Sequence, residues 1–145
     1  MKNNIKLILI IFFAAFFLNL FWENLHSLLY DWDKFPLQNN VYFYVYKILK
    51  STFIDAIFIS LIFLLNSLFR KNFQWIKNVE KRDYIVFVVF GLIFSFIIEI
   101  KAKILNMWSY NEYMPLIFGI GFTPLIQLAI TAVIALFIIK NYFKN

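Results

Sequence analysis

The 145-residue chain has no cysteine, one histidine, three prolines and three glycines, and only 15% of its residues are charged. Without cysteine, the chain can form no disulfide, use no thiol in catalysis and offer no thiolate to a metal. One histidine with scattered carboxylates is too small a donor set for zinc, and no Asp-rich motif supports a carboxylate-bound magnesium ion. We therefore expect neither a metal nor a cofactor.

Two further classes of protein find no support in the residue pattern. The pair Gly119 and Gly121 follows no predicted strand and lacks the rest of a nucleotide-binding fingerprint. The formal net charge is +6, but the basic residues lie between apolar runs and form no continuous patch. That distribution is typical of membrane topology signals, so we expect no nucleic-acid partner.

The chain is instead rich in apolar residues, with 63% hydrophobic and 22% aromatic. A soluble domain of this size cannot bury that much apolar surface, whereas a lipid bilayer covers it from outside. We predict one transmembrane domain over residues 1–145, an all-α integral membrane four-helix bundle. Its predicted spans cover residues 5–29, 49–69, 83–105 and 113–139.

Two segments have more than one interpretation. Residues 7–18 resemble the apolar core of a signal peptide, but the run continues without a cleavage motif, so we interpret it as an uncleaved span. A cleaved leader is the alternative. Residues 41–46 alternate tyrosine with apolar residues, which suits a short strand or an aromatic lead-in at the membrane interface. A helix that begins as early as Val41 also fits.

The distribution of lysine and arginine predicts the orientation. The N-terminus, the loop of residues 70–82 and the C-terminus carry nine of the 14 basic residues, and the other two connections carry five. Because positive charge is retained in the cytoplasm, we expect both termini to be cytoplasmic in a multi-pass protein of the cell (inner) membrane.

Polar residues recur at helical spacing in each span, so each set shares one helix face. The sets are Asn19, Glu23 and His26 in the first span, Asp55 in the second, Gly91, Ser95 and Glu99 in the third, and Thr123, Gln127 and Thr131 in the fourth. Hydrocarbon penalises polar groups, so we expect these faces to meet in one cavity that opens outward, with Gln127 near mid-membrane.

The candidate residues divide into two roles. Glu23, His26 and Glu99 are candidates for an acid–base set, since histidine titrates near neutral pH. The candidate ligand-binding residues are Asn19, Asp55, Trp108, Tyr110, Asn111, Thr123 and Gln127.

Structural interpretations of the same residues remain open. Glu23 and His26 lie close enough to a helix end to be wetted interfacial residues. Asp55 can pair with a lysine at position 50 or 103, and Glu99 can pair with Lys103 one turn later.

The segment between Gly119 and Pro124 predicts a kink or break in the fourth helix. Pro124 has no N–H and clashes with the carbonyl of Ile120. Broken helices at membrane depth line cavities and often form binding sites. A plain kink that lets Gly119 and Gly121 pack closely against another helix is the alternative.

Several short motifs resemble those of a group of small, uncharacterised prokaryotic multi-pass membrane proteins. They are Trp108-Ser109-Tyr110-Asn111, Met114-Pro115, Gly119-Ile120-Gly121, Thr123-Pro124 and Gln127, with Asn19, Trp22-Glu23 and Leu29-Tyr30. This resemblance covers the first, third and fourth spans and implies no activity.

A weaker resemblance is to the lycopene cyclase domain of carotenoid biosynthesis. Trp108-Ser109-Tyr110 matches that family's Trp-x-Tyr entry, but Gln127 stands where the family has paired acids after its proline. The resemblance implies cyclase chemistry in which Glu23 and Glu99 supply the acid.

Three functions fit these observations, and we rank them in this order. The first is a protein that binds a lipid or isoprenoid-like ligand, with the bilayer and a lipophilic small molecule as partners. The second is a membrane-embedded isomerase or cyclase that acts on a lipophilic substrate. The third is a small transporter that functions as a homo-oligomer, namely a homodimer. Its substrate site would lie at the break between Gly119 and Pro124.

Overall fold

A computed structural model describes residues 2–144. Four long helices run up and down in an antiparallel bundle: α1 (Lys2–His26), α2 (Val41–Phe69), α3 (Lys81–Ile104) and α4 (Phe122–Lys144). Two short 3₁₀ helices, η1 (Ser27–Leu29) and η2 (Phe73–Asn78), lie in the connections, together with a two-stranded hairpin of β1 (Leu116–Ile117) and β2 (Ile120–Gly121). The predicted all-α four-helix bundle is confirmed.

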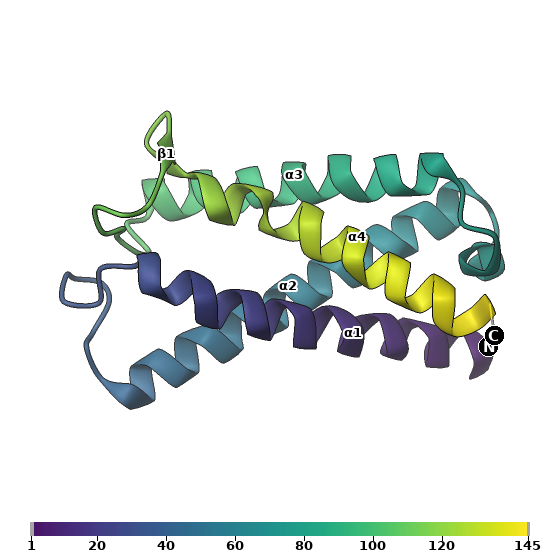
Figure 1. The fold of residues 1–145 in the computed structure, drawn as a ribbon, viewed down its shortest axis with the longest axis horizontal. Coiled ribbons are helices and arrows are strands. Elements are labelled where there is room, and N and C mark those ends of the chain that lie inside the picture. The colour runs from purple at the N-terminus through teal and green to yellow at the C-terminus, as the bar shows by residue number, and fades with distance from the viewer. Residues whose placement is uncertain (1, 145) are drawn as a thin grey trace.

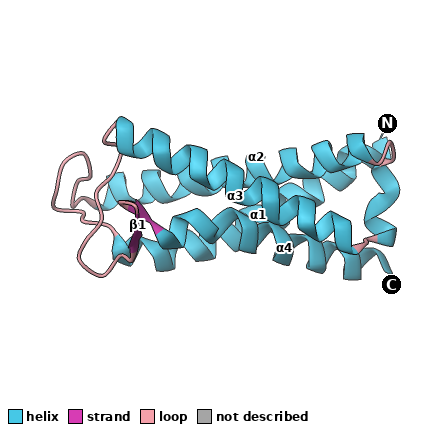
Figure 2. Ribbon diagram, turned by 90° about the horizontal axis from the view of Figure 1, so that it is seen from above, coloured by secondary structure: helices cyan, strands magenta, loops and turns pink. Residues whose placement is uncertain are grey.

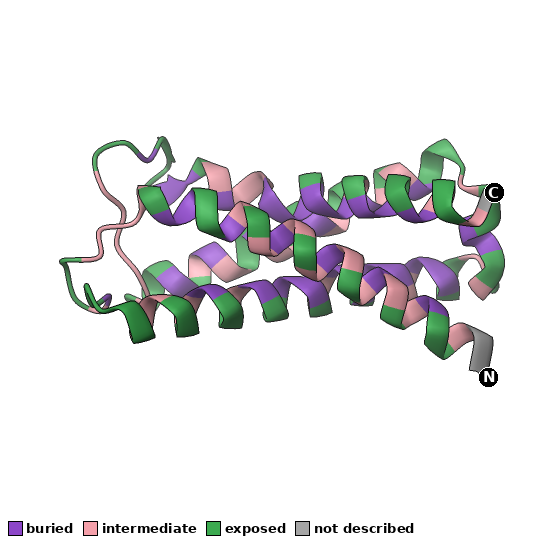
Figure 3. Cartoon of the chain, turned by 60° about the horizontal axis from the view of Figure 1, so that its bottom comes forward, coloured by how far each residue is buried: buried purple, intermediate pink, exposed green. Residues whose placement is uncertain are grey.

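Each helix is long and apolar enough to cross a membrane, with mean hydropathy of 2.4, 2.1, 2.4 and 2.4 from α1 to α4. Exposed and buried stripes alternate along every helix (Figure 3). The exposed stripes carry large apolar side chains such as Phe13, Phe17 and Phe21. A stripe of this kind suits lipid rather than water, so the chain is a multi-pass membrane protein.

The bundle has two distinct ends, which Figure 2 shows clearly. The end that holds both chain termini and η2 is called the terminal end below. The opposite end holds residues 27–40 and 105–121 and is called the loop end. The orientation of these ends in a membrane stays a prediction from the basic residues.

The second helix begins at Val41, well before the predicted start at residue 49. The side-chain oxygen of Asn40 accepts hydrogen bonds from the N–H groups of Tyr42 and Phe43 at 2.9 and 3.3 Å. This N-cap satisfies donors that the first turn leaves free and so favours helix from Val41 onward. The strand interpretation of residues 41–46 is wrong for that reason.

The predicted fourth span is also wrong at its start. Residues 116–121 form the hairpin, whose turn places Phe118 and Gly119 at φ 52° and 74°. A two-residue turn with both φ angles positive matches the twist of the paired strands. Helix α4 starts at Phe122, which puts Pro124 in the first turn, where a missing N–H costs nothing.

The expected kink between Gly119 and Pro124 is therefore the boundary between a hairpin and a helix. Within the described residues, α4 runs without interruption from Phe122. Gln127 consequently lies in the second turn of α4, near the loop end, and not near mid-membrane.

Helices α3 and α4 pack closely at Gly91. A Cβ atom placed there would lie 2.6 Å from the Cα atom of Ala129, so only glycine allows this approach. Gly91 shares its helix face with Ser95 and Glu99, and all three are buried. The contact therefore helps to position the polar face of α3 against α4.

The terminal end is closed by paired polar groups. Asp83 is fully buried and accepts from Arg70 Nη1 at 2.7 Å and from Asn66 Nδ2 at 2.9 Å. Trp75 Nε1 donates to Ser67 Oγ at 2.8 Å, and the Trp75 ring stacks on another aromatic ring in the core. These polar groups satisfy one another's hydrogen bonds, which indicates a structural role. Asn66, Ser67, Arg70, Trp75 and Asp83 are together called the terminal-end clasp below.

Candidate functional site

Buried polar side chains from three helices meet around Gln127. Its Nε2 atom lies 2.7 Å from Glu23 Oε1, 2.7 Å from Asp55 Oδ2 and 3.3 Å from Asn19 Oδ1. All four residues are buried. The amide nitrogen has two hydrogens, so three acceptors compete for them. The four side chains therefore meet at the Gln127 amide nitrogen. Together, Asn19, Glu23, Asp55 and Gln127 are called the carboxyl cluster below.

Glu23 and Asp55 are direct neighbours within this cluster. Their carboxyl oxygens each lie 2.7 Å from the same nitrogen, Gln127 Nε2. Two carboxylates that share a buried site repel each other, which favours the state in which one of them is protonated.

The amide groups of the cluster are oriented by their neighbours. Asn19 Nδ2 donates to the carbonyl of Ala15 at 2.9 Å, which leaves its oxygen facing the cluster. Thr131 Oγ1 lies 3.1 Å from that oxygen and 2.9 Å from the carbonyl of Gln127. These contacts direct the Gln127 amide nitrogen toward the two carboxyl groups.

Glu99 lies on α3 beside the cluster and belongs to a second chain of hydrogen bonds. Tyr110 donates its hydroxyl to Glu99 Oε2 at 2.7 Å, and Trp108 Nε1 donates to the same hydroxyl at 2.7 Å. The predicted roles of Trp108 and Tyr110 at the opening therefore have a structural counterpart: both residues hold Glu99 from the loop above it.

The ion pairs considered from the sequence are not formed. Lys103 Nζ donates to the carbonyl of Phe118 at 3.1 Å, and Lys50 Nζ lies 5.5 Å from the centre of the Tyr46 ring. Among the described residues, the ion pairs within 4.0 Å involve the carboxylates of residues 31, 80 and 83. Glu23, Asp55 and Glu99 thus have no lysine or arginine partner in residues 2–144.

A tyrosine pair covers the cluster at the loop end. Tyr30 and Tyr110 form a β-bridge, and their rings stack with centres 5.4 Å apart. The His26 ring lies 4.9 Å from the Tyr30 ring. Burial raises the pKa of both tyrosines above the ordinary value, and the nearby carboxyl groups raise it further. Both hydroxyls therefore stay protonated and available as donors.

Two predicted ligand-binding residues have other contacts. Asn111 donates from Nδ2 to the carbonyl of Leu28 at 2.8 Å, which ties the loop to the end of η1. Thr123 donates from Oγ1 to Met114 Sδ at 3.3 Å, between the hairpin and the start of α4. Neither contact reaches the carboxyl cluster, so both residues hold the loops in place.

Several buried polar atoms at the loop end have no hydrogen-bond partner. In residues 2–144 these are Trp22 Nε1, both ring nitrogens of His26, Thr52 Oγ1, Ser95 Oγ, Glu99 Oε1 and Ser109 Oγ. Thr52 lies one turn before Asp55, Ser95 lies one turn before Glu99, and Trp22 adjoins Glu23. His26, Thr52 and Ser95 therefore share helix faces with Glu23, Asp55 and Glu99.

Sequence reasoning missed Tyr30, Trp22 and Thr52 as members of this region. The spacing of three residues between Thr52 and Asp55 indicates a shared helix face and could have identified the threonine. In the sequence, Trp22 and Tyr30 resemble ordinary aromatic residues of a membrane interface. No local pattern indicates the long-range contact of Tyr30 with Tyr110.

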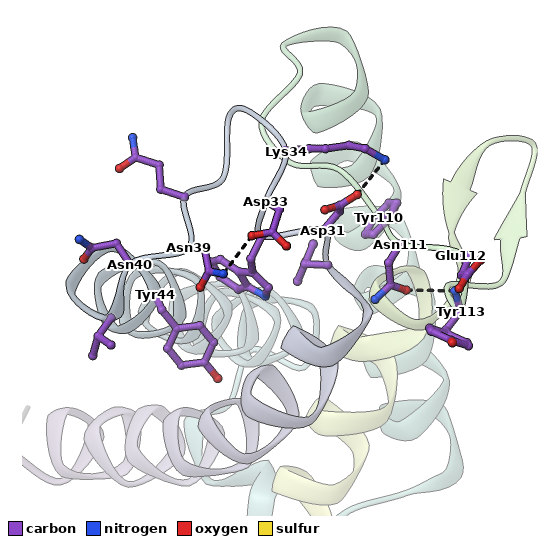
Figure 4. Close-up of a pocket in the computed structure, with 14 residues that line it drawn as sticks. Asp31, Asp33, Lys34, Asn39, Asn40, Tyr44, Tyr110, Asn111, Glu112 and Tyr113 are labelled. Carbon is purple, nitrogen blue, oxygen red and sulfur yellow. Dashed lines mark hydrogen bonds and ion pairs between the residues drawn. The ribbon is translucent and has the colours of Figure 1, made fainter.

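A pocket of about 690 Å³ opens at the loop end (Figure 4). Its lining includes Tyr30 and Tyr110 but none of the residues of the carboxyl cluster. Figure 4 also shows the bond from Asn39 to Asp33 at 2.9 Å and the ion pair of Lys34 with Asp31 at 2.8 Å. The hydrogen bond and charge of Lys34 lower the pKa of Asp31.

The pocket at the loop end is therefore not the single cavity expected from the sequence, because none of the polar helix faces lines it. The pocket is solvent-facing and lined by loop residues, whereas Glu23, Asp55 and Gln127 are packed against one another beneath it. Within residues 2–144, no three side chains of His, Asp or Glu are placed to hold a metal ion.

No protein-family model matches the chain, and neither a curated protein nor a solved structure matches it significantly. Both resemblances noted from the sequence stay predictions, and the site is interpreted from its own geometry.

Proposed function

We propose that this multi-pass membrane protein binds the polar end of a lipophilic ligand, a lipid or isoprenoid-like molecule, at the carboxyl cluster. The observation that carries the proposal is that His26, Thr52 and Ser95, which share helix faces with Glu23, Asp55 and Glu99, have buried polar atoms without a hydrogen-bond partner, as does Glu99 itself. The proposed setting is the cell membrane, with both termini in the cytoplasm and the loop end outside.

The energetic argument compares the two ends of the bundle. A buried polar group without a partner costs roughly 1–3 kcal/mol. At the terminal end, Asn66, Ser67, Trp75 and Asp83 all have partners. A bundle that can satisfy its polar groups at one end has no structural need to leave them unsatisfied at the other. A ligand that bonds these atoms explains the difference.

The position of the cluster favours a lipophilic ligand. His26 is the last residue of α1, and Gln127 lies in the second turn of α4, so the cluster is close to the predicted membrane surface. A ligand whose polar end reaches this depth places its remaining atoms beside apolar helices. Lipids and isoprenoid alcohols or quinones have this division between a polar end and a hydrocarbon tail.

The test is extraction of bound molecules from the purified protein, followed by mass spectrometry. Asn19→Leu removes a cluster member, and Asn24→Leu is its matched control. Asn24 lies on the same helix, is exposed, and makes the equivalent bond to the carbonyl four residues earlier, at 2.7 Å instead of 2.9 Å. We expect a near-stoichiometric lipophilic molecule with the wild type and Asn24→Leu, and its loss with Asn19→Leu.

Thr52→Val provides a second variant that does not disturb folding. It replaces an unpartnered buried hydroxyl with a methyl group of similar size, so thermal stability without ligand should not fall. We expect less ligand to co-purify with this variant. Equal ligand retention by Asn19→Leu, Thr52→Val and the wild type, or no bound molecule in any of them, overturns the proposal.

One observation favours a second candidate, a membrane-embedded isomerase or cyclase. Glu23 and Asp55 both contact the Gln127 amide, so with one of the two carboxyl groups protonated, that group can protonate a carbon–carbon double bond while the other accepts a proton from a neighbouring carbon. Proton count balances without a further reactant. The pairing also changes the predicted acid–base set: Asp55 stands beside Glu23, whereas Glu99 is bonded to Tyr110 and His26 has no partner.

The two candidates differ in what Glu23→Gln and Asp55→Asn do in cells. An enzyme loses turnover, so its lipophilic substrate accumulates and its product disappears from the lipid profile. An unchanged profile, together with continued ligand binding, excludes the enzyme and leaves the binding protein.

The transporter interpretation has lost its main support. It placed a substrate site at a break inside the fourth helix, and that segment is a hairpin that precedes α4. We therefore do not propose it.

A further inference from the structure

We propose that the polar end of the ligand is an organic ammonium group, held by the carboxyl cluster and Glu99 beneath the rings of Tyr30 and Tyr110. This inference rests on the proposed binding function and deepens it, because it names the chemical class that the site recognises.

The first argument is the sign of the charge in the site. Three carboxyl groups, Glu23, Asp55 and Glu99, are buried together at 3–8% exposure. The chain as a whole has a net charge of +6, yet no described lysine or arginine pairs with any of the three. A phosphate or carboxylate would enter this site against three acids without a basic residue to balance it, which is costly at low dielectric.

The second argument is the supply of acceptors. Glu99 Oε1 is buried and unpartnered, while Oε2 accepts from Tyr110. At the cluster, the single Gln127 nitrogen serves three acceptors. The site therefore has more acceptors than donors. An ammonium group brings donors and positive charge together, and bonds between charged partners are the strong ones.

The third argument is the aromatic cover. Tyr30 and Tyr110 stack at 5.4 Å, and His26 lies 4.9 Å from Tyr30. Aromatic faces attract ammonium groups within about 6 Å, an interaction that carboxylates nearby reinforce. An ammonium ion beneath these rings would contact aromatic faces on one side and carboxyl oxygens on the other.

The charged residues that line the loop-end pocket also favour a cation. Its lining contains the acids Asp31, Asp33 and Glu112 against one base, Lys34, which already pairs with Asp31. A cleft lined by one sign of charge raises the local concentration of the opposite ion. Because Tyr110 lines this pocket and also donates to Glu99, an ammonium ion concentrated there is next to a residue that contacts the buried acids.

Binding of a cation should release a proton from the carboxyl pair of Glu23 and Asp55, because a nearby positive charge favours the carboxylate form. The titratable groups around this position are Glu23 and His26 from α1, Asp55 from α2, Glu99 from α3, and Tyr30 and Tyr110 from the loops. Proton release on binding means that the affinity for ammonium weakens as the pH falls.

The experiment is isothermal titration calorimetry of the full chain in a neutral maltoside detergent. The probes are two matched pairs of a primary amine with its alcohol: dodecylamine with dodecanol, and butylamine with butanol. We expect dodecylamine to bind at least about tenfold more tightly than dodecanol. Binding by butylamine as well would identify a free ammonium compound as a ligand, and binding by dodecylamine alone would identify an amphiphile.

Three variants that replace a carboxyl group by an amide test the contribution of its charge, and one of them is the control. Glu99→Gln keeps an oxygen that can accept from Tyr110 but removes the charge, and Asp55→Asn is the second cluster variant. Glu80→Gln makes the same change at the exposed terminal end. We expect the two cluster variants to lose the preference for dodecylamine over dodecanol and Glu80→Gln to retain it. Repetition in buffers of different ionisation enthalpy measures the released proton.

The outcomes separate this inference from the proposed function. An extracted ligand that is neutral or anionic, or equal binding of dodecylamine and dodecanol, overturns the ammonium assignment and leaves the binding function intact. A preference for dodecylamine that persists in both cluster variants also overturns it. If neither an extracted ligand nor a probe binds, both proposals fail.

Discussion

The Tyr110 hydroxyl lies 2.7 Å from Oε2 of Glu99 and joins the loop before the hairpin to the buried face of α3. Few other side-chain contacts bring the loop end so close to the carboxyl cluster. Trp108 donates to the same hydroxyl, so the loop holds the tyrosine as well as covering the acid. Substitution of Tyr110 therefore tests both how the loop is held over Glu99 and how much the hydrogen bond stabilises the Glu99 carboxyl group.

Tyr110→Phe removes the donor and leaves both oxygens of Glu99 unpartnered. We expect the free energy of unfolding to fall by roughly 1–3 kcal/mol, the usual cost of such a group. The measurement is thermal unfolding in detergent. Tyr113→Phe is the control, because Tyr113 is 74% exposed. Equal destabilisation by the two variants would show that the bond to Glu99 contributes nothing.

The raised pKa of Tyr110 predicts a loss of stability in alkali. Burial is the main cause, and the Glu99 carboxylate adds to it. Below pH 10, the ordinary value, Tyr110 is protonated in both the folded and unfolded chains. Above it, the unfolded chain releases this proton and the folded chain retains it, so stability falls as the pH rises.

Unfolding temperatures measured between about pH 8 and 11 should therefore decline less steeply for Tyr110→Phe than for the wild type. Tyr30 has a raised pKa for the same main reason, so Tyr30→Phe should reduce the slope in the same direction. Parallel curves for all three proteins would contradict the assignment of buried, protonated tyrosines at the loop end.

Gly91→Ala should separate α3 from α4, because the added Cβ would lie 2.6 Å from the backbone of Ala129. Overpacking of this kind costs about 1–3 kcal/mol. Since α4 carries Gln127, the variant should also weaken ligand binding at the carboxyl cluster. Val88→Ile, which adds a methylene on a partly exposed face of α3, should change neither property. Unfolding and binding assays of both variants check this.

The terminal-end clasp predicts a contrast between two acids that share Arg70. Asp83 is buried, and its replacement by asparagine leaves the Arg70 side chain, 14% exposed, without its buried charged partner. Breaking a buried pair costs roughly 3–5 kcal/mol. Glu80, 53% exposed, makes a surface pair with the same arginine, so Glu80→Gln should cost no more than about 1 kcal/mol. Similar losses in denaturation experiments would argue against the buried clasp.

The orientation predicted from the basic residues is open to a direct measurement. A reporter fused after Asn145, active only in the cytoplasm, should be active, and one inserted at Asn39 in the loop end should be inactive there. The opposite pattern would place the carboxyl cluster near the cytoplasmic surface and invert the proposed access route.

Much of the carboxyl cluster was predictable from helical spacing. Asn19 and Glu23 share a face, and a polar face on an apolar helix must turn inward, because lipid cannot satisfy its hydrogen bonds. The same reasoning placed Asp55, Glu99 and Gln127 inside the bundle. It could not pair them, because no local pattern shows which acids on different helices lie at the same height.

The errors have physical causes as well. Pro124 suits the first turn of a helix as well as a kink, and its position in the chain does not distinguish the two. The hairpin that decides between them depends on pairing and on the positive φ angles of Phe118 and Gly119. Asn111 and Thr123 stay predicted ligand-binding residues, and their hydrogen-bond partners in the structure are backbone and sulfur atoms in the loops.

The sequence by itself determined the membrane class, the four helices and the inward direction of the polar faces, since each follows from hydrophobic periodicity along a single segment. The tertiary structure alone decided that Glu23 and Asp55 both contact the Gln127 amide, that Tyr30 stacks on Tyr110, and that no basic side chain in the described part of the chain pairs with Asp55 or Glu99. These relationships depend on the relative height and rotation of packed helices, which no single segment encodes.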